Sequence, residues 1–306
     1  MYKKISYSEF IEEVKNNILK FMPEEFADAK VNVQKINKTN RTVYGLIIKK
    51  KENGKEQMVY PTLYLEGFYE KEGDIDDVMM QIANTYVSAL NNVPAKFKKP
   101  ELVNKTLNSS NIIFTLINTE KNLELLKEVP HRAFYDLSIV YRSVVNIDED
   151  NGIASAIIRN EHMNKLGLLT EEELFETAYE NTKRLLPIEV KGMQEIMMEM
   201  IGMPPVGEEK MYVISNKNKI NGAINFLYVE DTLEKIAEKT NSNLYILPSS
   251  VHEVIAVVDE DGMEKGNLIN MVREVNEQEV SEEEQLSDNI YCYDKENKKI
   301  SLVTIF

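Results

Sequence analysis

The segment NLYILPSSVHEVIAVVDEDGMEKGNLINMVREVNE, from Asn243 to Glu277, decides how the C-terminal part of the chain folds. Its two apolar runs, Leu244–Leu247 and Glu253–Val258, have the length and β-branched content of buried strands. The Pro-Ser-Ser break between them indicates a turn, and the acidic stretch after the second run precedes an amphipathic helix. The segment therefore predicts two buried strands followed by a helix, with His252 where the second strand begins.

The rest of the sequence mixes helix and strand patterns. Ser6 with Glu9, and Thr170 with Glu173, form capping-box pairs that predict helices starting at these points. Three strand-like segments with polar, turn-forming links predict an antiparallel meander packed under the first helix. These segments are Lys30–Ile36, Thr42–Lys50 and Gln57–Leu65. Because strands and helices do not alternate strictly, we expect an α+β fold with mixed or antiparallel sheets, helices packed on them, and two subdomains.

Shifts in composition predict four regions along the chain. Residues 1–95 contain the first helix, the meander and a second helix, and residues 96–190 a strand, a hairpin and a helix. Residues 191–210 form a Met/Gly/Pro-rich linker or flap, because glycine and proline interrupt regular structure. Residues 211–306 form a C-terminal α+β region.

The linker or flap is rich in methionine. Six of the fourteen methionines of the chain lie in the stretch from Val190 to Met211, with Met211 included. Thioether side chains are flexible and polarizable, so packing in a core or under a lid is their more frequent role, and a pliable binding surface is the alternative.

Charge excludes one class of partner. The chain carries 36 Lys and Arg against 51 Asp and Glu, which gives a net charge of -15. This charge repels phosphate backbones, so we expect no direct nucleic-acid binding. It suits a basic protein partner, although many acidic proteins carry such a charge for solubility alone.

The sequence also suggests a compartment. Cys292 is the single cysteine, so no intrachain disulfide forms, and its place in an alternating run favours a small packed side chain over a nucleophile. The first residues, MYKKISYSEF, lack the apolar region of a signal peptide, and no apolar run is long enough to span a bilayer. We therefore expect a cytoplasmic protein without a membrane association.

The search for cofactor and metal motifs is negative. The sequence has neither the G-x-x-x-x-G-K-[ST] nor the G-x-G-x-x-G pattern that cradles phosphates. A zinc site with three imidazoles would use every histidine of the chain, namely His131, His162 and His252. Two acidic turns resemble calcium loops but fail on the spacing of their ligands. We expect no cofactor and no metal site.

The first candidate catalytic cluster consists of Ser249, Ser250, His252 and Glu253. The strand after His252 is apolar on both faces, which indicates a central strand whose first residues lie at the end of a sheet. Polar side chains there can line a cleft and act in hydrolysis, with a serine as nucleophile. The ordinary explanation is a histidine hydrogen-bonded to the preceding loop.

The second candidate cluster, for binding, consists of His131, Arg132, Asp136 and Arg142. A strand is expected over residues 135–142, and its alternation makes Asp136 and Arg142 point the same way. The ordinary explanation is an Asp–Arg ion pair on an exposed strand face.

Three tracts carry a family resemblance. They are TLINTEKNLELLKEVPHRAFYDLSIVYR (115–142), LGLLTEEELFETAYENT (166–182), and LYILPSSVHEVIAVVDEDG (244–262) followed by MVREVN. Over nearly its full length the chain resembles a bacterial family known only as a domain of unknown function, found in anaerobic Gram-positive bacteria. The middle helix is also similar to part of a second uncharacterised cytoplasmic family. The resemblance implies no activity and no catalytic residues.

These observations favour a non-enzymatic protein-binding or accessory factor. It would bind a basic partner through its acidic surface or its methionine-rich flap, and an inhibitor acting through the acidic surface is one form of this function. The alternative is a small-molecule hydrolase that uses His252 and Glu253 with Ser249 or Ser250. The oligomeric state is left open.

Overall fold

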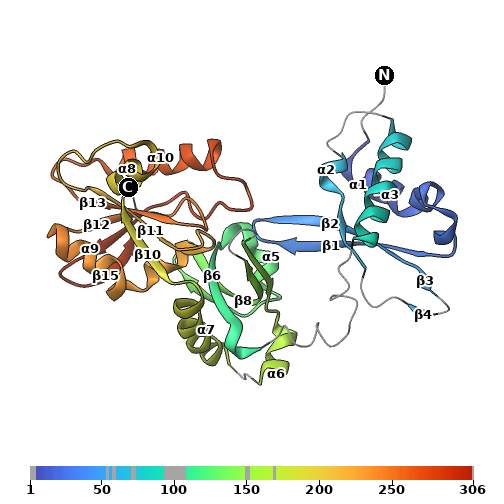
Figure 1. The fold of residues 1–306 in the computed structure, drawn as a ribbon, viewed down its shortest axis with the longest axis horizontal. Coiled ribbons are helices and arrows are strands. Elements are labelled where there is room, and N and C mark those ends of the chain that lie inside the picture. The colour runs from blue at the N-terminus through green and yellow to red at the C-terminus, as the bar shows by residue number, and fades with distance from the viewer. Residues whose placement is uncertain are drawn as a thin grey trace. The chain divides into compact units, whose positions relative to one another are not determined.

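The computed structural model describes residues 5–52, 55–56, 60–69, 74–92, 108–148, 152–167 and 170–304. The chain divides into two compact units (Figure 1). Unit 1 contains Met1–Lys38 and Thr42–Lys105, and unit 2 contains Thr39–Arg41 and Thr106–Phe306. The predicted boundaries at residues 95, 190 and 210 stay predictions.

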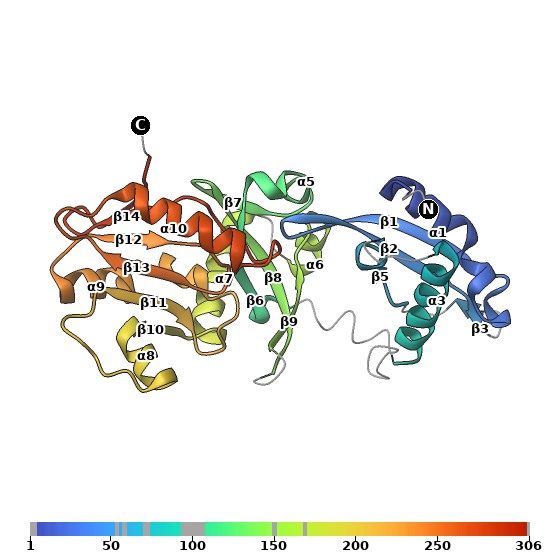
Figure 2. The ribbon, with the colours of Figure 1, turned by 90° about the horizontal axis from the view of Figure 1, so that it is seen from above.

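Unit 1 is built from helices packed on a small sheet with the strand order β1-β2-β5, and a separate pair of strands, β3 and β4 (Figure 2). The predicted capping box is confirmed, because Ser6 and Glu9 bond to each other's backbone at the start of the first helix. The buried hydroxyl of Tyr86 bonds to both the backbone nitrogen and the carbonyl of Ile48, at 2.7 and 3.1 Å, which ties the third helix to the second strand. The elements are α1 (Tyr7–Asn17), two 3-10 turns (Ile18–Phe21 and Glu24–Phe26), β1 (Lys30–Lys38), β2 (Arg41–Lys49), β3 (Lys51–Glu52), β4 (Lys55–Glu56), β5 (Leu63–Tyr64), α2 (Glu66–Tyr69) and α3 (Ile75–Asn91).

Two of the three strands predicted for the meander are confirmed as β1 and β2. The third prediction, Gln57–Leu65, falls partly on residues 57–59, which lie outside the described residues. Its described part forms only the short strand β5 at Leu63–Tyr64, because the chain turns at Leu65 into helix α2.

Unit 2 contains two antiparallel sheets that share one large apolar core. In the smaller sheet the strand order is β6-β8-β7, and β9 pairs with the far end of the long strand β8. In the larger sheet the order is β10-β11-β13-β12-β14-β15. The strands are β6 (Ile112–Asn118), β7 (His131–Phe134), β8 (Leu137–Asp148), β9 (Gly152–Ile157), β10 (Ile188–Gly192), β11 (Met211–Asn216), β12 (Leu244–Leu247), β13 (Val254–Val258), β14 (Tyr291–Asp294) and β15 (Lys299–Leu302).

Helices cover both faces of the larger sheet, as α9 and α10 do on opposite sides in Figure 1. The helices of unit 2 are α5 (Leu123–Leu126), α6 (Met163–Leu166), α7 (Glu171–Leu185), α8 (Met193–Ile201), α9 (Leu233–Thr240) and α10 (Lys265–Gln278). Its 3-10 turns are Ser109–Asn111, Glu120–Asn122, Asn160–His162, Gly222–Leu227 and Val229–Asp231. The predicted α+β fold class with antiparallel sheets is confirmed.

The segment that decides the C-terminal fold behaves as predicted. Strands β12 and β13 pair antiparallel, with Leu244 opposite Val258, and β13 lies between β12 and β11. Ala256 of β13 enters the large core, and Val257 points to the other face, where α10 packs. A strand buried on both faces needs apolar side chains at consecutive positions, which is what the run VIAVV supplies.

One predicted strand is wrong at its start. The sequence predicted a strand through Tyr135, whereas Tyr135 and Asp136 form the turn between β7 and β8, with Phe134 paired opposite Leu137. Tyr135 adopts the left-handed conformation with φ 54°. Few residues other than glycine and asparagine adopt it, so a tyrosine there conceals the turn.

Candidate functional site

Helix α8 follows directly after β10, the edge strand of the larger sheet. Gly192 precedes the helix in an extended conformation, and Gly202 ends it with φ 69°, in the left-handed region that glycine adopts without strain. None of the nine residues of α8 is buried, although six of them are methionine or isoleucine, at positions 193, 196, 197, 198, 200 and 201. The core role that is more frequent for such a segment is therefore wrong for α8.

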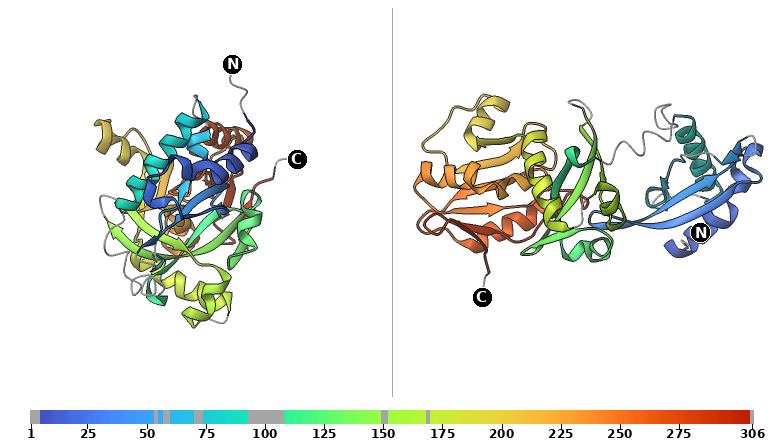
Figure 3. Two further views of the ribbon diagram at one scale, coloured as in Figure 1. Left: turned by 90° about the vertical axis from the view of Figure 1, so that its right-hand side faces the viewer. Right: turned by 90° about the horizontal axis from the view of Figure 1, so that it is seen from below.

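Exposed apolar side chains therefore follow one another on α8 and the loop after it. Among the described residues, the three most exposed large hydrophobic side chains are Val206, Met200 and Ile201, at 80%, 78% and 67% exposure. Met198 at 56% and Met203 at 46% adjoin them in the sequence. We call these five residues the methionine surface. Figure 3 shows α8 and the loop after it standing out from the body of unit 2. Exposed apolar side chains gathered in this way are typical of an interaction site.

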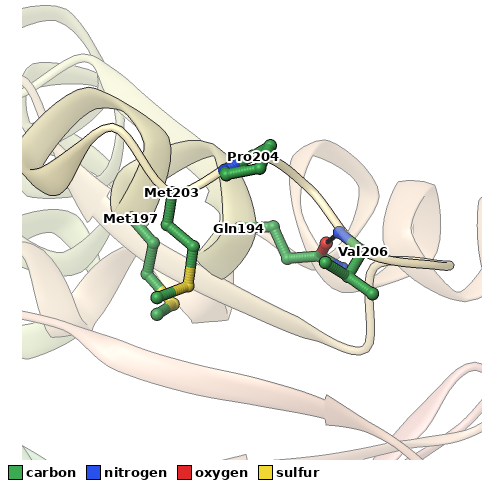
Figure 4. Close-up of a pocket in the computed structure, with 5 residues that line it drawn as sticks. All are labelled: Gln194, Met197, Met203, Pro204 and Val206. Atoms are coloured by element: carbon green, nitrogen blue, oxygen red, sulfur yellow. Dashed lines mark hydrogen bonds between the residues drawn. The ribbon is translucent and has the colours of Figure 1, made fainter.

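Beside the methionine surface, a hollow of about 210 Å³ opens between α8 and the loop that follows (Figure 4). Met197 and Met203 line one part of it, and their thioether ends point the same way in Figure 4. Gln194, Pro204 and Val206 complete the lining.

Hydrogen bonds hold the loop against the helix. The side chain of Gln194 accepts a bond from the backbone N–H of Val206 and donates one to the carbonyl of Glu208, at 3.0 Å. The carboxylate of Glu209 accepts bonds from the backbone N–H groups of Gln194 and Met211, at 2.9 and 3.1 Å. The hollow therefore has a fixed wall on both sides.

The surroundings of the methionine surface are acidic. Residues 189–210 hold five carboxylates and two lysines, which leaves a local charge of -3. Lys191 already pairs with Glu199 at 2.8 Å, and Lys210 lies 3.6 Å from the carboxylate of Glu208 and also pairs with Glu260. The excess of carboxylates over lysines thus gives the surroundings of the methionine surface a negative potential.

A second hollow, of about 430 Å³, lies beside β10. Asp231 stands in it between Lys183 and Lys235, and bonds to both lysines hold the pKa of the Asp231 carboxyl below its usual value. Pro187, Ile188 and Val190 form its apolar wall.

Both ring nitrogens of His252, the predicted catalytic histidine, have hydrogen-bond partners. The Nδ1 atom of His252 accepts a hydrogen bond of 3.3 Å from the backbone N–H of Asn221, and Nε2 lies 3.1 Å from Oε1 of Glu284. This bond to His252 is the main reason why the pKa of the Glu284 carboxyl is lowered. Both ring nitrogens are in use, so the geometry matches a histidine that fastens the preceding loop.

The other members of the first cluster lie close to His252 in the chain, and both serines accept hydrogen bonds from backbone N–H groups. The buried Ser250 hydroxyl accepts a 3.0 Å bond from the backbone N–H of His252, and the Ser249 carbonyl accepts one from the N–H of Leu286. Glu253 is half-buried immediately before β13. The hydroxyl of Ser250 thus contacts the backbone of His252 and not its ring.

Close packing also fixes the loop that faces His252. A Cβ atom at Gly222 would lie 2.4 Å from Oγ of Ser215 and 2.5 Å from the carbonyl oxygen of His252. Only glycine fits this position.

The four residues of the second predicted cluster have separate partners. The Arg132 guanidinium pairs with Glu171 and Glu172, at 2.9 and 2.6 Å, and lies 3.9 Å from the ring centre of Phe175. His131 contacts the carbonyl of Val129 through Nδ1, at 3.0 Å. These contacts fasten the first turn of α7 to strand β7.

The expected pair of Asp136 and Arg142 is not formed. Asp136 accepts hydrogen bonds from the side chains of Ser287, Asn289 and Tyr291. Arg142 donates to the hydroxyl and the carbonyl of Ser155, at 2.8 and 3.3 Å, and burial lowers its pKa. Asp136 lies in the turn before β8, so the alternation from which the pairing was predicted does not include it.

Cys292 is half-buried on β14, and burial raises the pKa of its thiol. Within the described residues, no three His, Cys, Asp or Glu side chains gather in a way that could hold a metal ion. None of the described helices combines the length and the apolar character needed to cross a bilayer.

Comparisons with known proteins place the chain in a family. No curated protein and no solved structure matches it. The model of DUF5688, described as a family of unknown function, matches residues 7–295. The chain therefore belongs to the DUF5688 family.

Proposed function

We propose that this protein is a protein-binding factor, and that it captures a basic partner segment on its methionine surface. The observation that carries the proposal is the 67–80% exposure of Met200, Ile201 and Val206 at one helix end and in the loop that follows it. Leaving such side chains in water costs apolar free energy, at about 25 cal/mol per Å². A partner that covers them recovers this free energy.

Methionine suits this task because its unbranched thioether chain adapts to differently shaped apolar side chains. The hollow lined by Met197 and Met203 would receive one anchoring side chain. Interfaces commonly draw most of their affinity from one or a few such anchors.

The acidic residues around the methionine surface determine the kind of partner. A second copy of this chain would bring a local charge of -3 against -3, and the two copies would repel each other. Lys or Arg on both sides of the anchor would instead meet Glu195 and Glu208, which are exposed. The partner is therefore a segment with an apolar anchor and basic flanks.

The test is a selection of displayed random peptides on the full-length protein. We expect enriched peptides to carry Leu, Ile, Phe or Met with Lys or Arg nearby, and to lose affinity as salt rises, since exposed charges are screened. Enrichment of acidic peptides, or of none, would contradict the proposal.

Matched variants localise the binding. Met200→Glu combined with Ile201→Glu places charge in the middle of the surface and should abolish binding of the enriched peptides. Leu123→Glu is the control, because Leu123 is also an exposed large hydrophobic residue, at 56%, on helix α5. Equal loss of peptide binding in both variants would contradict the assignment of binding to the methionine surface.

A further inference from the structure

We propose that the thioethers of Met197 and Met203 also bind a soft monovalent metal ion, of the class of Cu(I), in the hollow between α8 and its loop. Both side chains line this hollow, one from the helix and one from the loop. Figure 4 draws their sulfur ends next to each other and pointing the same way. This inference goes beyond partner binding, because it needs sulfur atoms and not only apolar area.

The ligand type selects the ion. Thioether sulfur is a soft, uncharged donor that suits Cu(I), whereas Mg²⁺ and Ca²⁺ require oxygen ligands. The remaining lining is an amide, a proline and a valine, so it offers no carboxylate or imidazole to a harder ion. The amide oxygen of Gln194 is already occupied by the N–H of Val206.

A further thioether, that of Met193, lies on the helix face of Met197 but is not among the residues that line the hollow. Met193 precedes Met197 by four residues, and residues at this spacing are neighbours on a helix surface. Both Met193 and Met197 are half-buried, so neither is turned fully into solvent.

Charge supports a cation at this place. Two thioethers leave the single positive charge of the ion uncompensated, and the net local charge of -3 of residues 189–210 offsets it. The sulfur atoms in the hollow and the negative charge around it therefore both favour a bound cation.

The experiment titrates the full-length protein with Ag(I), an air-stable ion of the same class, and with Cu(I) in competition with a chromophoric chelator. We expect binding that weakens by roughly tenfold or more in the double variant Met197→Leu with Met203→Leu, since both donor atoms are lost. Leucine keeps the apolar volume, so folding should be retained, which thermal unfolding checks.

Two controls make the result specific. Met80→Leu removes a more exposed thioether, 52% exposed on α3, and should leave the affinity unchanged. All titrations are repeated with Cys292→Ala, because Cys292 carries the one thiol of the chain. Absence of binding, or equal binding by the double variant and the wild-type protein, would refute the metal site.

The failure of this inference is distinguishable from the failure of the proposed function. The metal titrations contain no peptide, so their outcome does not depend on whether a peptide binds. Met200→Glu with Ile201→Glu should lose the peptides and keep the ion.

Discussion

At the scale of single residues, two buried asparagines of unit 2 complete each other's hydrogen bonds. The Asn40 backbone N–H donates to the side-chain oxygen of Asn122, and the Asn122 amide donates back to Asn40, both at 2.7 Å. The Asn40 amide also donates to the carbonyls of Glu282 and Gln285, at 2.9 and 2.6 Å. Asn40 has φ 60°, which asparagine tolerates better than most residues.

Removing one member of this pair should be costly. In Asn122→Ala the buried N–H and side-chain oxygen of Asn40 lose their partners, so we expect a loss of roughly 2–4 kcal/mol in the free energy of unfolding, measured by denaturant titration. Asn270→Ala, at an exposed position on α10, is the control and should change stability by less than about 0.5 kcal/mol. A similar small change for Asn122→Ala would show that the pair contributes little.

The hydrogen bond between His252 and Glu284 makes a prediction about pH. The Glu284 pKa is lower in the folded protein than its ordinary value, so the pair stabilises the fold above that ordinary value. This stabilisation is lost as the pH falls through the lowered pKa. In His252→Ala we expect the Glu284 pKa to rise toward its ordinary value, measured by NMR titration of the carboxyl carbon.

The control for this titration is His162→Ala, which removes the histidine that lies 3.5 Å from Glu161. It should leave the Glu284 pKa unchanged. An unchanged value in His252→Ala as well would show that other groups, such as Ser281, set it.

Some single residues could be predicted from the sequence and others could not. The capping pairs were predictable, because they depend on neighbours three residues apart. The partners of Asp136 could not be predicted, because they lie more than 150 residues away on the loop before β14 and on β14 itself.

At the scale of elements, helix α7 depends on its cap. The Thr170 hydroxyl accepts the N–H of Glu173, and the Glu173 side chain accepts the N–H of Thr170. Thr170→Ala should therefore cost about 1 kcal/mol in the free energy of unfolding. Thr177→Ala in the middle of the same helix is the control, and alanine there should be neutral or slightly stabilising. If both variants behave alike, the cap does not set the stability of α7.

Helix α8 marks the limit of prediction from sequence at this scale. Its composition identified an unusual segment, but apolar residues at most positions fit a buried helix as well as an exposed one. Exposure depends on what the rest of the chain leaves uncovered, and no local pattern contains that information. The roles of Gln194 and Val206 were missed for the same reason, since they are visible only once the loop is placed against the helix.

At the scale of the whole molecule, the fold class followed from the sequence because strands and helices did not alternate strictly, and the central strand β13 followed from its continuous apolar run. The net charge of -15 disfavours nucleic-acid binding. Part of this negative charge lies around the methionine surface. In the proposed function, charge would bring a basic partner near and apolar contact would retain it. The two features together make binding more selective than either would alone.

The most direct test of this account uses methionine methyl groups labelled with ¹³C in the full-length protein. On addition of the selected basic peptide, we expect the methyl resonances of Met198, Met200 and Met203 to shift, while that of the buried Met79 stays in place. Shifts confined to methionines elsewhere in the chain, or none at saturating peptide, would contradict the claim that the methionine surface binds the partner.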